Sequence, residues 1–236
     1  MQQAWYPVAL SEMIPAGTSA GVVIDGAEIV VWRDTSGAAH TWEDRCPHRG
    51  MKLSFGFVRG DHIACLYHGW EYDTGGTCRY IPAHPQLEVP KTICVKTYGV
   101  AEAGGMIWVR PGDEGEAPAV DGAAGVRSLY LDAPLAAAVA ALPGLGATGP
   151  VTVDGMLARF DTDLGPVIAG LQPVDGGRSA LHLAMPGRPE AAARVELATR
   201  AERLRRSAAG RGGPLARVRA GVRRRFARKD GTPGAG

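Results

Sequence analysis

The sequence has no long hydrophobic run, and none of its apolar stretches approaches the roughly 18 uninterrupted residues that a membrane-spanning helix needs. Its first residues also lack the basic cluster and apolar core of a secretory signal. Aromatic residues make up only 6% of the 236 residues, but hydrophobic residues reach 45%, which is enough for an ordinary buried core. We therefore expect a globular, cytoplasmic protein.

Cysteine is scarce too, with only Cys46, Cys65, Cys78 and Cys94 present. Four cysteines in a small secreted domain would suggest disulfides. Here there is no export signal, and two of the four stand at metal-ligand spacing, so we expect a reducing compartment. Cys78 and Cys94 are interpreted as ordinary thiols.

Charge of both signs is present, but it is unevenly distributed. Residues 1–189 carry 13 basic and 20 acidic side chains, whereas residues 190–236 carry 13 basic and only 4 acidic ones. This asymmetry predicts that residues 190–236 form a separate basic tail.

Up to residue 111 the pattern is typical of short strands separated by turns, without helical periodicity. Residues 21–32 contain two β-branched runs joined by Asp-Gly, the strongest short hairpin signal, and residues 70–80 and 93–109 repeat the idea. These features predict an all-β domain over residues 1–111.

Residues 112–126 are small and acidic, a composition typical of a linker. Beyond it, one helix and several strands are predicted, at residues 135–142, 151–162, 166–174 and 178–184. A small α/β unit over residues 127–189 follows from these predictions.

The basic tail is predicted to be helical at about 189–206 and again at 215–229, where apolar residues form one stripe and arginines cover the rest. A basic amphipathic helix suits an acidic redox partner, an anionic membrane surface, or packing on its own domain. No aromatic platform accompanies the arginines, which argues against nucleic acid.

Two short loops carry paired metal ligands, Cys46 with His48 and Cys65 with His68. Thiolate and imidazole together suit either zinc or an iron–sulfur cluster, and a Cys₂His₂ zinc site is the simplest alternative. Zinc sites usually pair like ligands, whereas here each loop supplies one cysteine and one histidine. That arrangement favours a two-iron cluster, with each loop reaching both irons.

Cys46-Pro-His-Arg-Gly50 and Cys65-Leu-Tyr-His-Gly-Trp70 resemble the two cluster-binding boxes of the Rieske family, in particular those of Rieske non-haem iron, aromatic-ring-hydroxylating oxygenases. The resemblance covers residues 5–109. It implies a Rieske-type antiparallel β-sandwich with one [2Fe–2S] cluster per chain. By the same resemblance, Cys46 and Cys65 hold the buried iron, and His48 and His68 hold the outer iron.

The high-potential respiratory members of that family carry a disulfide between the loops and a serine donor, and Met51, Tyr67 and Trp70 stand at those places here. The resemblance therefore implies a low-potential cluster. It also assigns supporting roles around the ligands, in loop shape and shielding from water, to Arg49, Gly50, Tyr67, Gly69 and Trp70. For Trp70 an ordinary place in the core is an equal alternative.

A complete oxygenase of this family passes its electron to a mononuclear iron held by two histidines and a carboxylate. Only His182 lies beyond the predicted linker, so we expect that iron site, and with it a catalytic residue, to be missing. His40, His62 and His84 are interpreted as surface or turn residues and His182 as a structural strand residue. Residues 170–183 are faintly similar to a hairpin of the oxygenase catalytic domain, so residues 127–189 would be a reduced form of it.

The leading hypothesis is a one-electron redox component, or accessory subunit, of an oxygenase-like system. It would take electrons from a flavin reductase or a ferredoxin and deliver them to a separate acceptor protein. One alternative is an oxygenase that acts on a small organic substrate with an atypical or subunit-shared iron. Another is a redox-responsive binding protein.

Overall fold

The structure, a computed structural model, describes residues 4–112 and 115–212. Up to residue 110 the chain forms short antiparallel strands in three small sheets, ordered β1-β10-β9, β2-β3-β4 and β5-β6-β7-β8. The strands are β1 (Tyr6–Leu10), β2 (Ser19–Ile24), β3 (Ala27–Arg33), β4 (Ala39–Glu43), β5 (Phe57–Arg59), β6 (His62–Ala64), β7 (Glu71–Asp73), β8 (Cys78–Tyr80), β9 (Gly99–Ala103) and β10 (Met106–Arg110). The predicted all-β, antiparallel character of this region is confirmed.

The Asp-Gly hairpin predicted for residues 21–32 is confirmed. Ile24 of β2 pairs with Ala27 of β3, and the two turn residues Asp25 and Gly26 both have positive φ, as a type I′ turn requires. The backbone N–H groups of this turn donate to the carbonyl oxygens of Pro173 and Val174 at 3.0 and 2.8 Å. The hairpin therefore also ties the first half of the chain to the second.

The second half is a five-stranded antiparallel sheet, ordered β11-β15-β14-β13-β12, with two helices on one face. Its elements are β11 (Ala123–Leu131), α1 (Leu135–Ala141), β12 (Thr152–Asp154), β13 (Leu157–Thr162), β14 (Gly165–Asp175), β15 (Arg178–Pro186) and α2 (Ala191–Gly212). Leucine and alanine side chains from the sheet and both helices form a common core. None of the helices in the described ranges is both long and apolar enough to cross a membrane.

Two sequence-based boundaries differ from this arrangement. The last residues of the predicted linker 112–126 already belong to β11, where Ala123 pairs with Pro186. A run of small residues suggests a linker, but strand pairing uses backbone N–H and C=O groups and does not depend on the size of the side chain. The predicted tail also begins inside the second unit, because Leu197 and Leu204 of α2 are buried in its core. The helix predicted at 215–229 lies outside the described residues.

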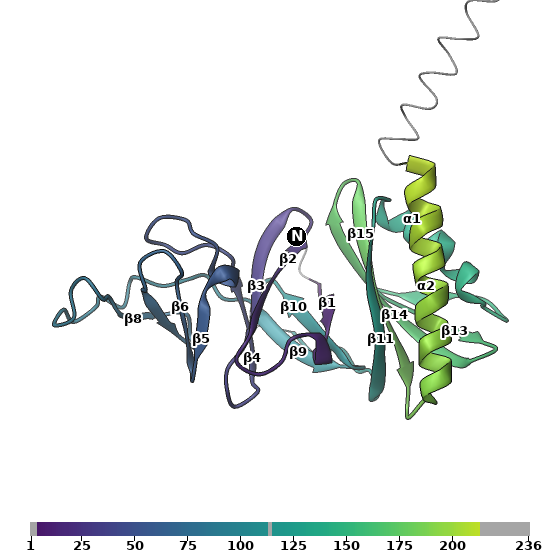
Figure 1. Ribbon diagram of the computed structural model, residues 1–236, viewed down its shortest axis with the longest axis horizontal. Coiled ribbons are helices and arrows are strands. Elements are labelled where there is room, and N and C mark those ends of the chain that lie inside the picture. The colour runs from purple at the N-terminus through teal and green to yellow at the C-terminus, as the bar shows by residue number, and fades with distance from the viewer. Residues whose placement is uncertain (1–3, 113–114, 213–236) are drawn as a thin grey trace, which may run out of the picture.

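The first half packs on the face of the five-stranded sheet that α1 and α2 leave open, so β1 lies beside β14 and β15 and β2 beside β14 (Figure 1). Leu10, Met106 and Trp108 of the first half share an apolar cluster with Ile168 and Ala184 of the second. The small sheet β5–β8 lies at the end of the molecule far from α2 (Figure 1). The predicted metal ligands are carried by the loops of that end.

Candidate metal centre

The two ligand loops repeat one backbone geometry. The N–H of Cys46 donates to the carbonyl of Met51 at 2.8 Å, and the N–H of Gly50 donates back to the carbonyl of Cys46 at 2.8 Å. In the second loop Cys65 and Gly69 make the equivalent bonds, both at 2.9 Å, with Trp70 in the place of Met51. The loops are therefore turns with equivalent backbone hydrogen bonds, with the cysteine and the glycine in matching positions and the histidine two residues after Cys46 but three after Cys65.

Each turn depends on a glycine four residues after its cysteine. Gly50 has φ +71° and Gly69 has φ +70°, a left-handed conformation that other residues rarely adopt. The predicted role of Gly50 and Gly69 in shaping the loops agrees with this geometry.

The structure brings the four predicted ligands together as an inner and an outer pair. Cys46 and Cys65 are only 2% and 3% exposed, whereas His48 is half-buried and His68 is exposed. The two imidazole rings lie 4.7 Å apart, centroid to centroid. The thiols therefore face the core and the imidazoles face the surface.

The environment of the inner pair favours one thiolate. Hydrogen bonding from the Cys65 thiol, supported by the Tyr72 hydroxyl and backbone N–H groups of the loop, lowers the pKa of Cys46 to about 5. The hydrogen bond that the Cys65 thiol donates to Cys46, together with burial, raises the pKa of Cys65. Two buried thiols that share one proton are ready to bind a cation that supplies the missing positive charge.

Tyr72 is a site residue that the sequence analysis did not single out. Its hydroxyl lies 3.1 Å from the Sγ of Cys46. Because burial raises the pKa of Tyr72, the hydroxyl stays protonated and donates a hydrogen bond to the sulfur. The signal was available, because Tyr72 follows Trp70 by two residues and alternation in β7 turns its side chain inward.

Aromatic rings cover the outer pair. The Trp70 ring stacks on His48 with an interplanar angle of 3° and centroids 4.3 Å apart, and the Tyr67 ring lies 3.8 Å from that of His68. Trp70 therefore contacts the predicted ligand His48 and also packs against the core of the first half. Arg49 contributes its backbone N–H, which bonds the Cys46 sulfur, while its side chain is exposed.

The donor set fits a two-iron cluster. Two buried thiols and two outer imidazoles offer two donors to each of two metals, as in a Rieske centre. Within residues 4–112 and 115–212, no group of three or more histidine, cysteine, aspartate or glutamate side chains is arranged to hold one metal ion. The other two thiols, Cys78 and Cys94, form no disulfide, and burial raises the pKa of Cys78 to about 11.

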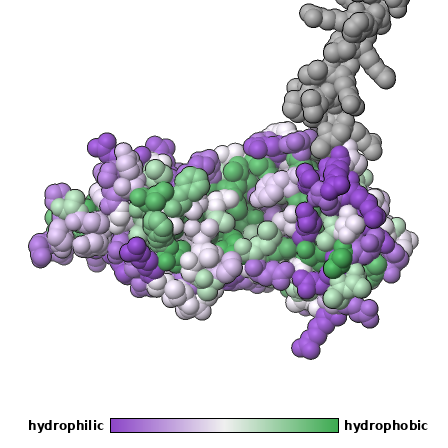
Figure 2. All heavy atoms as spheres, viewed as in Figure 1, coloured by the Kyte–Doolittle hydropathy of each residue, from purple (hydrophilic) through white to green (hydrophobic). Residues whose placement is uncertain are grey.

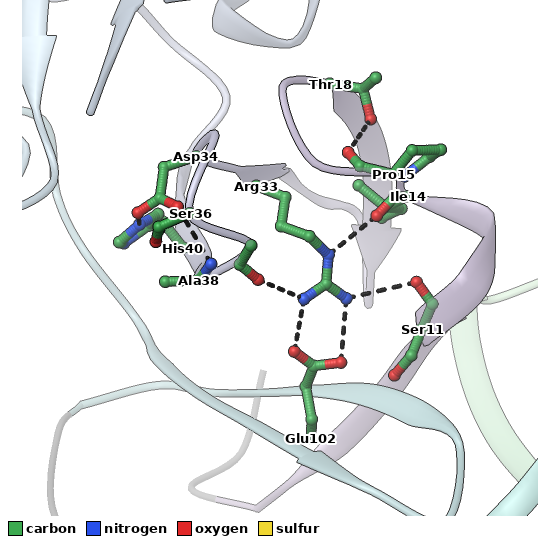
Figure 3. Close-up of polar contacts among 11 residues, drawn as sticks. Ser11, Ile14, Pro15, Thr18, Arg33, Asp34, Ser36, Ala38, His40 and Glu102 are labelled. Atoms are coloured by element: carbon green, nitrogen blue, oxygen red, sulfur yellow. Dashed lines mark hydrogen bonds and ion pairs between the residues drawn. The ribbon is translucent and has the colours of Figure 1, made fainter. Parts of the chain in front are cut away.

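Two of the histidines outside the centre are less exposed than predicted. His40 lies in β4, partly buried, with its Nε2 3.0 Å from Asp34 Oδ2 (Figure 3). His62 lies in β6, where Arg79 Nη2 approaches its Nδ1 at 2.7 Å. Both were expected at the surface or in turns, because a single polar residue does not reveal that strand pairing will bury it. His84 is exposed, as predicted.

His182 is fully occupied by structural hydrogen bonds. Its Nδ1 lies 2.8 Å from Ser128 Oγ and its Nε2 lies 2.8 Å from Gln172 Oε1, while Gln172 Nε2 donates to the carbonyl of Val23 in β2. Burial lowers the pKa of His182 to about 3, so the ring is neutral. The prediction of a structural strand histidine agrees with these contacts.

Comparisons with known proteins agree with this geometry. Residues 4–98 match the family model of the Rieske [2Fe-2S] domain. Oxidoreductase NdmD of Pseudomonas putida is 40% identical over 109 residues, which are 46% of this chain and 18% of that protein. The 3-chlorobenzoate-3,4-dioxygenase oxygenase subunit of Comamonas testosteroni is 35% identical over 114 residues, 48% of this chain and 26% of that protein. The chain thus spans about a fifth to a quarter of the length of these relatives.

Solved structures extend the likeness in fold to the second half. NdmA of Pseudomonas putida CBB5 with caffeine has a TM-score of 0.67 and 20% identity, covering 89% of this chain and 82% of that one. Dicamba monooxygenase bound to dicamba has a TM-score of 0.64 and 20% identity, covering 77% of this chain and 75% of that one. At this identity the likeness establishes the fold alone.

Proposed function

We propose, from the premise that residues 4–98 form a Rieske [2Fe–2S] domain and bind its cluster, that this protein carries single electrons within an oxygenase-like system. The observation that carries the proposal is the inner pair of buried thiols facing an outer pair of imidazoles, one of which reaches the surface. The cluster supplies the one-electron chemistry, and the chain's own residues hold it and connect it to solvent.

In this proposal Cys46 and Cys65 hold the inner iron, and His48 and His68 hold the outer one. Neutral imidazoles leave a cluster less negative than four thiolates would, and this raises its potential above that of all-cysteine clusters. Met51, Tyr67 and Trp70 provide neither an interloop disulfide nor a serine donor, so the potential lies at the low end of the Rieske range. Tyr72 and the stacked Trp70 exclude water from the two sides of the site.

The partners proposed are a flavin reductase or ferredoxin as donor and a separate protein as acceptor, all in the cytoplasm. Support for a separate acceptor comes from the second half of the chain. Its one histidine within the described ranges, His182, has both ring nitrogens hydrogen-bonded to Ser128 and Gln172. No residues described there are arranged to hold a single metal ion.

A second candidate is an oxygenase whose iron site is completed by another subunit. The likeness in fold to solved oxygenases across both halves of the chain favours it. It differs from the first proposal in requiring tightly bound iron beyond the cluster.

Iron and acid-labile sulfide per chain, measured on anaerobically purified protein, test the proposal together with an electron paramagnetic resonance spectrum after dithionite reduction. We expect two iron and two sulfide per chain with a Rieske-type spectrum. The His48→Ala and His68→Ala variants should lose the Rieske-type spectrum. The His84→Ala variant, which changes an exposed histidine outside the loops, should keep this spectrum. Zinc without sulfide would overturn the proposal, and additional tightly bound iron would favour the oxygenase.

A further inference from the structure

The segment that carries both ligand loops is basic and exposes apolar side chains, in contrast to the rest of the domain. Residues 1–111 hold nine basic and eleven acidic side chains, a net charge of −2. Residues 45–70, which include both ligand loops, hold four basic side chains and a single acidic one, Asp61, which is paired with Arg79. The positive charge at this end is therefore a local feature and not a property of the whole domain.

Three arginines there have no carboxylate partner. Arg45, Arg49 and Arg59 are exposed, and none of them makes an ion pair with any residue that the structure describes. Arg45 runs along the first loop, its Nε 3.5 Å from where a Cβ on Gly50 would stand. An unpaired guanidinium in water keeps its full capacity to bind a carboxylate in a bidentate fashion.

Exposed apolar side chains accompany these arginines within residues 45–70. Leu66 and Tyr67, in the second loop, are 48% and 55% exposed, and Phe57 is 52% exposed. Phe57 pairs with Ala64, one residue before Cys65, and the guanidinium of Arg59 lies 5.9 Å above its ring. Figure 2 shows green, apolar surface in this half of the molecule among the purple polar groups.

We name this surface the cluster face and define it by Arg45, Arg49, Phe57, Arg59, Leu66 and Tyr67. An apolar centre with a charged rim is the usual anatomy of a protein interface. Because the rim is positive and its arginines are unpaired, the complementary surface carries carboxylates. His68, whose ring contacts that of Tyr67, is exposed and so connects the centre to a partner's surface.

We infer that the cluster face docks an acidic one-electron redox protein, whose carboxylates pair with Arg45, Arg49 and Arg59 around an apolar contact at Phe57, Leu66 and Tyr67. The inference rests on the proposed function and names its partner by surface chemistry. One electron passes between the partner's centre and the cluster in each encounter, and no atom is transferred. This assigns partner recognition to the domain that carries the cluster, and not to the basic tail.

Small charged oxidants can measure the sign of charge at the face. The holoprotein, reduced with one equivalent of dithionite, is mixed in a stopped-flow instrument with ferricyanide or with tris(phenanthroline)cobalt(III). Each oxidant takes one electron from the cluster and becomes ferrocyanide or the cobalt(II) complex. Raising the ionic strength from about 0.01 to 0.1 M shortens the Debye length from about 30 to 10 Å. The change in oxidation rate over this range therefore reports the charge close to the cluster.

With a positive face, the ferricyanide rate falls as salt is added and the cobalt rate rises. Arg49→Glu with Arg59→Glu should slow ferricyanide about tenfold at low salt and reduce its salt dependence. Arg59 lies six residues before Cys65. Arg59→Glu alone should lower the ferricyanide rate at low salt and its salt dependence, and should leave the electron paramagnetic resonance spectrum of the cluster unaltered. Arg188→Glu makes the same charge change at an exposed arginine of the second half and should have no effect.

A protein probe then tests the partner. An acidic plant-type ferredoxin should exchange electrons with the holoprotein faster at low salt than at high salt, and Arg59→Glu should remove this difference. The inference would be overturned if the ferricyanide rate rose with added salt, or if the ferredoxin rate depended neither on salt nor on Arg59→Glu. It would also be overturned if the holoprotein self-associated and Arg59→Glu abolished that association. Absence of a Rieske-type spectrum would instead overturn the proposed function, whatever the charge of the face.

Discussion

At the scale of single residues, Tyr72 helps to stabilise negative charge on the inner thiols. Its hydroxyl donates to the Sγ of Cys46 across 3.1 Å, and both groups are buried. A hydrogen bond to sulfur stabilises negative charge there, and the reduced cluster is one electron more negative than the oxidised one. The bond therefore favours the reduced state.

Replacing Tyr72 with phenylalanine should lower the reduction potential. If the bond is about 1 kcal/mol stronger in the reduced state, the shift for one electron is about 40 mV. Potentiometric titration followed by electron paramagnetic resonance measures it. Tyr67→Phe is the matched control, since the Tyr67 ring contacts His68 but its side chain is exposed, and its potential should be unchanged. Equal potentials in the two variants would show that Tyr72 does not tune the cluster.

A second residue-scale feature is the buried chain of hydrogen bonds through His182. Because Gln172 donates through Nε2 to Val23, its Oε1 accepts a proton from His182 Nε2, and the Nδ1 of His182 accepts from Ser128. This fixes the neutral tautomer. The folded pKa of about 3 lies below the ordinary value of 6.5, so the unfolded chain binds a proton at mildly acidic pH that the folded chain does not.

Folding stability should therefore decrease as the pH falls below about 6.5, and this contribution should level off near pH 3. Between pH 6.5 and pH 5 it amounts to about 2 kcal/mol. His182→Gln should cost about 1–3 kcal/mol at pH 7 but lose this part of the pH dependence. Urea unfolding at pH 7 and pH 5 measures both, and equal pH dependence in the two proteins would refute the prediction.

At the scale of elements, the ligand loops show why glycine stands four residues after each cysteine. A Cβ on Gly69 would lie 3.0 Å from Pro82 Cγ, in a residue whose φ of +70° already disfavours a side chain. We expect Gly69→Ala to distort the second loop and lower the cluster content of the purified protein. The strain costs about 1–2 kcal/mol before any clash is counted.

Gly26→Ala is the control for this prediction, because Gly26 has a similar φ of +80° but nothing lies within 4 Å of the place where its Cβ would stand. It should cost about the same strain yet leave iron and sulfide content unchanged. If both variants kept a full cluster, the close approach of Gly69 to Pro82 would have no role in the site.

Elements were predictable where local chemistry determines them. The Asp25-Gly26 turn and the two ligand loops use residues whose backbone preferences act within a few positions, so the sequence alone located them. The start of β11 and the burial of α2 depend on partners far along the chain, at Pro186 and in the core around Leu197. For Tyr72, alternation in β7 indicates an inward side chain, but its contact with Cys46 spans 26 residues and no local pattern indicates it.

At the scale of the whole molecule, the two halves approach each other closely at Gly170 of β14. A Cβ there would lie 2.7 Å from Met106 Sδ and 2.8 Å from Pro7 Cβ, both in the first half. No sequence pattern announces this contact, because a glycine inside a strand is compatible with a bulge, a bend or a close approach. Only the packing of the first half on the open face of the sheet explains why a larger residue is excluded.

Gly170→Ala should therefore separate the halves slightly without altering the cluster, because the second ligand loop joins β6 to β7 in the sheet at the end of the molecule far from α2 (Figure 1). Overpacking of this kind costs about 1–3 kcal/mol, and Gly170→Val should cost more. Gly176→Ala, in the turn after β14 with nothing within 4 Å, should be near neutral. Urea unfolding followed by circular dichroism gives the stability, and the reduced electron paramagnetic resonance spectrum reports the cluster. If Gly170→Val left the urea midpoint of unfolding unchanged, the two halves would not be in close contact at this position. If it abolished the electron paramagnetic resonance spectrum, the cluster would depend on the packing of the two halves.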